Sequence, residues 1–562
     1  MDRRHHSHFA SVAVRYSALA CVAAALSTSC SGGGHSGTAT PSGSAGGSGS
    51  GSGPGTGMAS ASDVLTYHND IGRTGQYLAE TTLTPANVNA TQFGKVGFLS
   101  VDGKVDAEPL YASNVSMGGG THNVVFVASE HDSLYAFDAD TRALIWRRSL
   151  LGSGETTSDN RSCSQITPEI GITSTPVIDR SRGANGVIYA VAMTKDANGV
   201  YHQRLHALDL STGGELFKGP TEIAATFPGN GANSANGIDR FDPAQYAERQ
   251  ALTLVNGNVY LGWTSHCDQG TYGGWVMAYN ADTLAQTSAL DLTPNGSEGS
   301  VWMSGAGMAS DGNALYLLDA NGTFDSTLTS GGLPSNGDYG NTFLKLATSP
   351  SLSVADYFAP MNTVAESNQD IDLGSGGALV LPNLTDGAGT TRHLAVGAGK
   401  DSKIYVVDRD AMGKFDSTRN AIWQEIDGQL GGGVFGMPAY YGNVVYYGAV
   451  GDHLKAFPIA SARLATTPSS SSAGTFPYPG TTPSISANGT QNAIVWAAEN
   501  GAVGALHAFN AGNLAQELYN SNQAGSRDTF GPGNKFITPM IAHGHVYVGA
   551  TNGVAVFGLL GQ

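Results

Sequence analysis

One phrase recurs along this chain: an alternating apolar strand that ends in Ala-x-Asp or a relative, then a turn, then another short strand. It appears at 134–146 (LYAFDADTRALIW), 205–217 (LHALDLSTGGELF), 276–288 (VMAYNADTLAQTS), 404–415 (IYVVDRDAMGKF) and 506–518 (LHAFNAGNLAQEL). Alternation of apolar and polar residues is typical of twisted antiparallel sheets. A repeat of roughly 45–75 residues built only from strands predicts a radial array of sheets, a β-propeller.

The repeat also predicts how many sheets there are. Each repeat divides into four strands, and the first strands begin near residues 106, 173, 250, 302, 374, 435, 480 and 537, which predicts an all-β fold of eight four-stranded blades over 62–562. The last repeat offers only three strands, so we expect segment 94–101 (GKVGFLSV) to supply the fourth and close the ring. Four insertions are expected to be loops on the propeller faces: 151–171, 221–248, 322–341 and 464–479.

The charge balance excludes some kinds of partner. The chain has 28 Lys+Arg against 45 Asp+Glu, a net charge of −17, and its basic residues do not cluster. Nucleic acids and anionic membrane surfaces attract basic patches, so neither is an expected partner.

The N-terminus has the pattern of an export signal. Arg3, Arg4 and Arg15 precede the apolar run 16–26, which is too short to span a bilayer, and Cys30 follows it. A cysteine at this place resembles a bacterial lipoprotein signal, so we expect 1–30 to be a signal peptide, Cys30 to be lipidated and 31–61 to be a Gly/Ser-rich tether. Ordinary cleavage without lipidation is the alternative. Either way the protein is expected to be exported, to the periplasm or the cell surface.

Two cysteines remain beyond the signal, Cys163 and Cys267. An exported compartment permits a disulfide between them, and two small buried thiols are the alternative. Two cysteines alone cannot form a structural zinc site.

The repeat resembles the blade motif A-x-D-x-x-T-G-x-x-x-W of quinoprotein alcohol dehydrogenase-like (PQQ-repeat) propellers. Segment 205–217 keeps Ala207, Asp209, Thr212 and Gly213, whereas 134–146 has Arg142 in place of the glycine. The resemblance extends over about 62–562 and is closest to an exported, lipoprotein-like subgroup of that family.

The resemblance implies a pyrroloquinoline quinone (PQQ) cofactor and a calcium ion on the ring axis. By motif position, Trp302 would stack on the quinone, Asn321 would bind calcium, Asp370 or Asp372 would be the catalytic base, and Lys400 would bind a quinone oxygen. Each has a structural alternative: a packing tryptophan, a turn asparagine, turn-capping carboxylates and a solvated lysine.

Three features of the family are missing. The chain has no adjacent cysteine pair, no C-x-x-C-H heme motif, and no evident glutamate in the second repeat, where the family places a calcium ligand. Glu169, just before a first strand, is a candidate replacement. Losing a charged ligand weakens a site for a hard cation such as calcium.

Two function classes follow. The first is a binding or assembly module of the cell envelope that engages a protein or glycan partner. In either class we expect the protein to be a monomer. The second is a PQQ- and calcium-dependent oxidoreductase of alcohols or sugars with a degenerate metal site. Convergence of the five candidate residues in one axial pocket would favour the oxidoreductase, and their dispersal over outer loops would exclude it.

Overall fold

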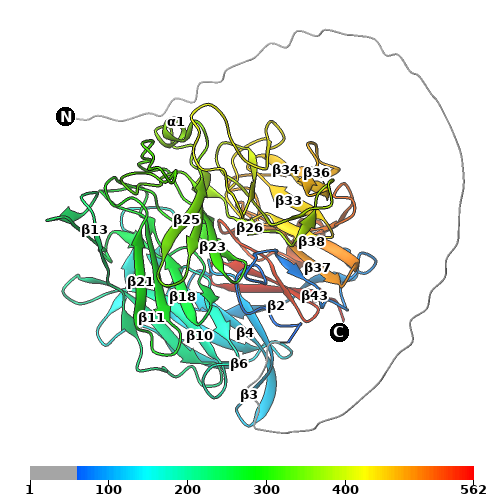
Figure 1. Cartoon of the computed structure of the whole chain (residues 1–562). Helices are drawn as coiled ribbons and strands as arrows, with labels where there is room; N and C mark the ends of the chain where they lie inside the picture. Colours follow the sequence, from blue (N-terminus) through cyan, green and yellow to red (C-terminus); the bar gives the residue numbers. More distant parts are fainter. Residues whose placement is uncertain (1–59, 562) are drawn as a thin grey trace, which may run out of the picture. The chain divides into compact units, whose positions relative to one another are not determined.

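The chain folds into many small antiparallel sheets, and helices are few and short (Figure 1). The computed structural model describes residues 60–561, so the predicted signal peptide, Cys30 and nearly all of the tether at 31–61 lie outside the described residues. The helices in this range are α1 (Thr363–Ser367) and the 3-10 turns η1 (Met303–Gly305), η2 (Leu373–Ser375) and η3 (Ser521–Arg527). Within 60–561 no helix has the length and apolar character needed to cross a membrane.

Eight of the sheets in the described range have four strands or more. The first contains β3 (Leu110–Met117), β4 (Gly120–Ser129), β5 (Ser133–Asp138) and β6 (Leu144–Ser149). The second contains β7 (Thr156–Asp159), β8 (Glu169–Ile170), β9 (Val177–Asp179), β10 (Val187–Lys195), β11 (Tyr201–Asp209) and β12 (Thr221–Glu222). The third contains β17 (Thr253–Val255), β18 (Asn258–Gly262), β20 (Trp275–Asn280) and β21 (Gln286–Asp291). The fourth contains β22 (Ala309–Ser310), β23 (Ala314–Leu318), β24 (Phe343–Ala347) and β25 (Ser353–Phe358).

The other four large sheets follow in chain order. The fifth contains β26 (Leu379–Val380), β29 (Leu394–Ala398), β30 (Ile404–Asp408) and β31 (Gln424–Ile426). The sixth contains β32 (Ala439–Tyr441), β33 (Val444–Gly448), β34 (Asp452–Ala460), β35 (Arg463–Leu464) and β36 (Ser470–Phe476). The seventh joins β1 (Gln76–Tyr77) to β37 (Ser484–Asn488), β38 (Gln491–Glu499), β39 (Ala505–Asn510) and β40 (Glu517–Asn520). The eighth joins β2 (Phe93–Ser100) to β41 (Met540–Ala542), β42 (His545–Ala550) and β43 (Gly553–Leu559).

Small sheets occupy some of the insertions. β13 (Thr226–Pro228), β14 (Ser234–Ala235) and β15 (Ile238–Arg240) form one, β16 (Tyr246–Ala247) and β19 (Thr264–Ser265) another, and β27 (Leu384–Thr385) and β28 (Thr391–Arg392) a third. The prediction that 151–171, 221–248 and 464–479 are loops is wrong in part. β7 and β8 belong to the second sheet, β12 pairs with β11, and β36 pairs with β34. β34 is nine residues long, and without β36 its outer edge would leave backbone groups unpaired, so the extended segment 470–476 binds there as a further strand.

The recurring Ala-x-Asp ends the third strand because its carboxylate builds the next turn. Asp209 Oδ1 accepts hydrogen bonds from the backbone N–H groups of Ser211 and Thr212, and Asp138 does the same for its own turn. The fourth residue after this Asp has positive φ, which is 64° at Gly213 and 63° at Arg142. The repeated phrase therefore encodes an aspartate-capped turn between the third and fourth strands.

The start of the chain joins its end, as the sequence predicted for 94–101. β2 pairs antiparallel with β43, with a register shift between Lys95 and Gly97 (Figure 1). The pairing gives the last sheet its fourth strand and covers an edge that would otherwise be open.

The segment 64–75 links the inner strands of successive sheets. Its backbone hydrogen-bonds, in chain order, to Tyr111, Ile178, Ser310, Val380, Tyr440 and Ile485. The Arg73 side chain, fully buried, adds bonds to Thr253 and Met308. Since twelve residues reach the first strands of six sheets, these strands lie close to one short segment of the chain.

Candidate functional site

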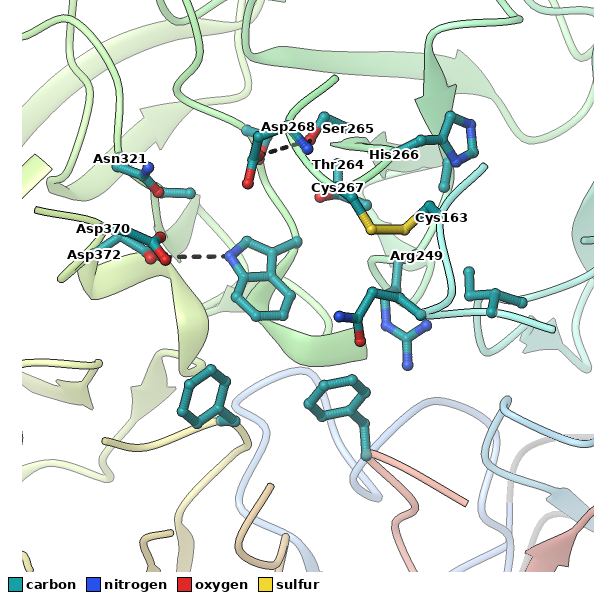
Figure 2. A pocket seen from close by; sticks show the side chains of 18 of the residues that line it. Cys163, Arg249, Thr264, Ser265, His266, Cys267, Asp268, Asn321, Asp370 and Asp372 are labelled. Carbon is teal, nitrogen blue, oxygen red and sulfur yellow. Dashed lines mark hydrogen bonds between the residues drawn. A yellow bond between two sulfur atoms is a disulfide. The ribbon is translucent and has the colours of Figure 1, made fainter. Parts of the chain in front are cut away.

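A cavity of about 430 Å³ collects five residues that the sequence singled out: Trp302, Asn321, Asp370, Asp372 and Lys400 all line it. Its volume lies in the range of small-molecule sites. Figure 2 shows Asn321, Asp370 and Asp372 on one side of the cavity and Arg249 with a disulfide on the other. The residues are thus not dispersed over outer loops.

The antiparallel order of the strands explains this convergence. Trp302 and Asp372 precede the first strands β22 and β26, while Asn321 and Lys400 follow the second strands β23 and β29. In an antiparallel pair, the start of one strand and the end of the next lie at the same end of the sheet. Two neighbouring sheets therefore present all four side chains at one end.

Asp372 is the centre of the polar side of the cavity. It is fully buried, it lies 2.6 Å from Lys400 Nζ, and its Oδ2 accepts a hydrogen bond of 3.3 Å from Trp302 Nε1. Burial raises the pKa of Asp372, and the positive charge of Lys400 offsets part of that rise. Asp372 is therefore a carboxylate whose proton affinity is set by burial and by one bound cation.

Lys400 binds a second carboxylate, that of Asp370, whose side chain is 69% exposed. Burial opposes the charge of Lys400, but the two aspartates outweigh burial and raise its pKa. Lys400 is thus an ammonium held between a buried and an exposed carboxylate, and not the solvated lysine of the alternative interpretation.

Aromatic rings form another part of the wall. Trp302 meets Phe435 and Phe536 in edge-on contacts, each with ring centroids 6.1 Å apart, and Tyr478 packs edge-on against Phe435 at 5.3 Å. All four line the cavity. Such a set offers flat apolar surfaces to a planar ligand.

Arg249 is the cavity residue that sequence reasoning missed. It is 6% exposed, its guanidinium lies 4.7 Å from the Phe536 ring centroid, and no partner for its Nε is found within 60–561. A buried N–H group without an acceptor is costly unless a ligand supplies one. The signal in the sequence was the charged pair Glu248–Arg249 shortly before the first strand β17, the place that Asp370 and Asp372 occupy before β26.

Cys163 and Cys267 form a disulfide, with their Cα atoms 5.6 Å apart. Both line the cavity, together with their neighbours in the segments 165–170 and 264–268. The bond joins two loops that are 104 residues apart in sequence, so it fixes a large part of the cavity wall.

The second predicted calcium ligand, Glu169, is not among the residues that line the cavity. Its carboxylate accepts a hydrogen bond from Thr157 Oγ1 and lies 3.0 Å from His131 Nδ1. Glu169 lies on β8, and its carboxylate is bound by Thr157 and His131, so it does not contribute to the cavity that contains Asn321.

The cavity fits the quinone better than the calcium ion. Calcium takes six to eight oxygen ligands, yet residues 60–561 contain no group of three or more His, Cys, Asp or Glu side chains arranged to hold a metal. Of the three aspartates that line the cavity, Asp370 and Asp372 already bind Lys400, and Asp268 accepts hydrogen bonds from Ser265 and Tyr272. In contrast, the aromatic wall and the Arg249 guanidinium suit a planar molecule with acidic groups.

Comparison with known proteins identifies the fold. No protein-family model and no curated protein matches the chain. Among solved structures, it is similar to the quinohemoprotein alcohol dehydrogenase of Comamonas testosteroni, with a TM-score of 0.61 and 15% identity over 89% of this chain and 81% of that one. A quinohemoprotein alcohol dehydrogenase of Pseudomonas putida HK5 (TM-score 0.57, 15% identity, 89% of this chain and 81% of that one) and a europium-containing methanol dehydrogenase (0.59, 12%, 89% and 98%) are also similar.

These likenesses show the fold and nothing finer. The chain has the PQQ-type β-propeller fold that the repeat and the motif resemblance predicted.

Proposed function

We propose that the cavity binds a planar quinone with acidic groups, of the PQQ class, and that the chain is a quinone-dependent oxidoreductase of alcohol or sugar hydroxyl groups. One observation carries the proposal: Trp302, Asn321, Asp370, Asp372 and Lys400 line a single cavity of small-molecule size. A flat protein-docking surface would not require these side chains to converge.

In this proposal the quinone, when bound, would supply the acceptor for the electrons of the substrate. Asp372 would take the proton of the substrate hydroxyl, because its burial raises its pKa towards that of a useful base. Lys400 and the Trp302 indole N–H would hold the Asp372 carboxylate in position. Arg249, on the opposite side, would bind an acidic group of the quinone.

The proposal omits calcium. Lys400 would provide a positive charge beside Asp372, and Arg249 would bind an acidic group of the quinone, so binding of the quinone should not depend on calcium.

The envelope binding module is the second candidate. It is favoured by the lack of a metal-holding group within 60–561, because a propeller that only binds a ligand needs no catalytic metal. Such a module would use the same cavity to bind a ligand without turnover, or its exposed loops to bind a protein or glycan.

Titration of the purified protein with PQQ tests the proposal. Quenching of tryptophan fluorescence should saturate equally with EDTA and with calcium, and an artificial electron acceptor should then be reduced when alcohols or sugars are added. Trp302→Phe should weaken the quenching, whereas Trp423→Phe is the matched control, since Trp423 packs between Arg392 and Arg463 and does not line the cavity. Binding without turnover would favour the module, and no binding would refute the quinone site.

We further propose that the eight large sheets are eight blades of one ring that β2 closes. The pairing of β2 with β43 and the contacts of 64–75 with the inner strands of successive sheets support this. Deletion of 94–101 should then destabilise the whole ring, which cooperative unfolding would report.

Export and lipidation at Cys30 are also part of the proposal. The signal-like residues 1–30 support it, and so does the Cys163–Cys267 disulfide, since disulfides persist in oxidising compartments. Labelling of the cells with a radioactive fatty acid should mark the protein but not its Cys30→Ser variant. Equal labelling of both would exclude this anchor.

A further inference from the structure

A second cavity, of about 440 Å³, lies where the first described residues meet the end of the chain. Its wall comes from residues 62 and 77–82, from the turn between β5 and β6, from the hairpin turn 543–545 and from the facing edges of β2 and β43. Nothing in the proposed quinone chemistry uses this cavity.

One residue of the cavity wall, Arg142, has an unusual backbone conformation. It takes the place of a glycine in the repeat motif, and its φ of 63° lies in the left-handed region, as does that of Gly213 at the corresponding position (64°). A residue with a Cβ is disfavoured there by about 1–2 kcal/mol. Backbone strain of this kind persists when other interactions of the residue offset it, and it is frequent at functional sites.

Leu284 is an example of a non-glycine residue whose positive φ is offset by the burial of its side chain. It occupies the corresponding position of the third sheet with a φ of 57°, and it is fully buried in a core cluster, so apolar burial offsets its strain. Arg142 is half-buried, and within 60–561 no carboxylate lies at ion-pair distance from its guanidinium. Neither burial in the core nor an ion pair therefore offsets the cost of the positive φ at Arg142.

The facing strand makes room for the Arg142 side chain. β2 has its register shift at Val96, and a Cβ on Gly97 would lie only 2.5 Å from Arg142 Cδ. A β-bulge and a glycine thus accommodate the side chain where the two strands meet, next to the cavity.

The acidic groups of the cavity are held elsewhere. Glu80 accepts hydrogen bonds from the backbone N–H groups of Thr82, Leu83 and Gly544, and Asp140 lies 3.0 Å from His543 Nε2. His545 donates a hydrogen bond through Nδ1–H to the His543 carbonyl oxygen. The guanidinium fork of Arg142 remains for an external anion.

We propose that this cavity is a binding site for an oxyanion, a phosphate or carboxylate group, with Arg142 as its main ligand. The planar guanidinium matches two oxygens of such a group at once. The proposal is independent of the quinone site, since the two cavities have no wall residue in common.

Thermal unfolding of the full-length protein tests it, with inorganic phosphate or acetate compared with chloride at equal ionic strength. Phosphate should raise Tm in a saturable way, and calorimetry should give a Kd that Arg142→Gly weakens at least tenfold. Gly is the residue that the turn prefers, so this variant should fold. Arg148→Ala, an exposed arginine on β6 outside the cavity, is the matched control and should bind as the parent does.

Two results would overturn the proposal. One is the absence of any Tm rise beyond that in chloride with both anions. The other is an unchanged phosphate Kd in Arg142→Gly, which would place the anion elsewhere, for example at Arg249. Neither result depends on whether PQQ binds.

Discussion

The two cavities differ in how their cations are paired: Lys400 in the first binds two carboxylates, whereas Arg142 in the second has no ion pair within 60–561. In the cavity with Trp302, the structure surrounds Lys400 with two aspartates, and one of them is fully buried. In the cavity at the junction of β2 and β43, the carboxylates nearest Arg142 are bound to other groups. A cation that is paired within the protein sets the properties of its partner, whereas an unpaired cation is available to a ligand.

The largest expected effect follows from removing the paired cation. Lys400→Met should destabilise the protein by about 3–5 kcal/mol at neutral pH, because the buried Asp372 loses its partner. Its pKa, already raised by burial, should then rise further. An acid whose pKa is higher in the folded state loses stability as pH rises from its unfolded value towards its folded value, so acidification should restore part of the loss.

Chemical denaturation of Lys400→Met at several pH values measures this. Lys400→Arg, which keeps the charge, is the control and should lose much less stability. Equal stability of Lys400→Met and the parent at pH 7 would show that Asp372 is not ionised beside Lys400.

The disulfide should matter for one cavity and not for the other. Replacing Cys163 and Cys267 together by serine should lower the free energy of unfolding by about 2–4 kcal/mol, and it should weaken PQQ binding, since both residues line that wall. The phosphate-dependent rise in Tm should persist in the same variant. Loss of both binding activities at a temperature where the variant is folded would contradict the separation of the two sites.

Arg249 is a third cation of interest: it is buried, and its Nε has no hydrogen-bond partner within 60–561. Arg249→Met should weaken the binding of PQQ by about 1.5–3 kcal/mol, the usual contribution of a hydrogen bond to a charged group. The stability of the ligand-free protein should fall only slightly. An apolar residue of similar size replaces a guanidinium whose Nε has no partner within 60–561, but the charge that helps to keep Asp106 ionised is lost. Titration and denaturation of the same sample separate these effects, and a loss of stability with unchanged affinity would mean that Arg249 serves only the fold.

The sequence predicted the parts of this molecule that depend on local pattern. Alternation and the aspartate-capped turn predicted the propeller and the pairing of 94–101, and motif positions led to the five residues of the first cavity. The binding partners of single side chains depend on contacts between segments that are distant in sequence, and a local sequence pattern does not contain this information. Glu169 thus binds His131 and not the cavity, and Arg249 and the role of Arg142 were not foreseen.

The smallest expected effect tests the left-handed turn itself. Arg142→Gly should raise the stability of the ligand-free protein by up to about 1 kcal/mol, because glycine adopts a φ of 63° without the steric cost of a Cβ, less the added entropy of the unfolded chain. Leu284→Gly has the same backbone benefit but removes a fully buried side chain, so it should destabilise the protein by several times as much. Denaturant unfolding of the two variants compares them directly. Destabilisation by Arg142→Gly of the size found for Leu284→Gly would show that Arg142 supports the fold, and a ligand would then not be needed to explain its conformation.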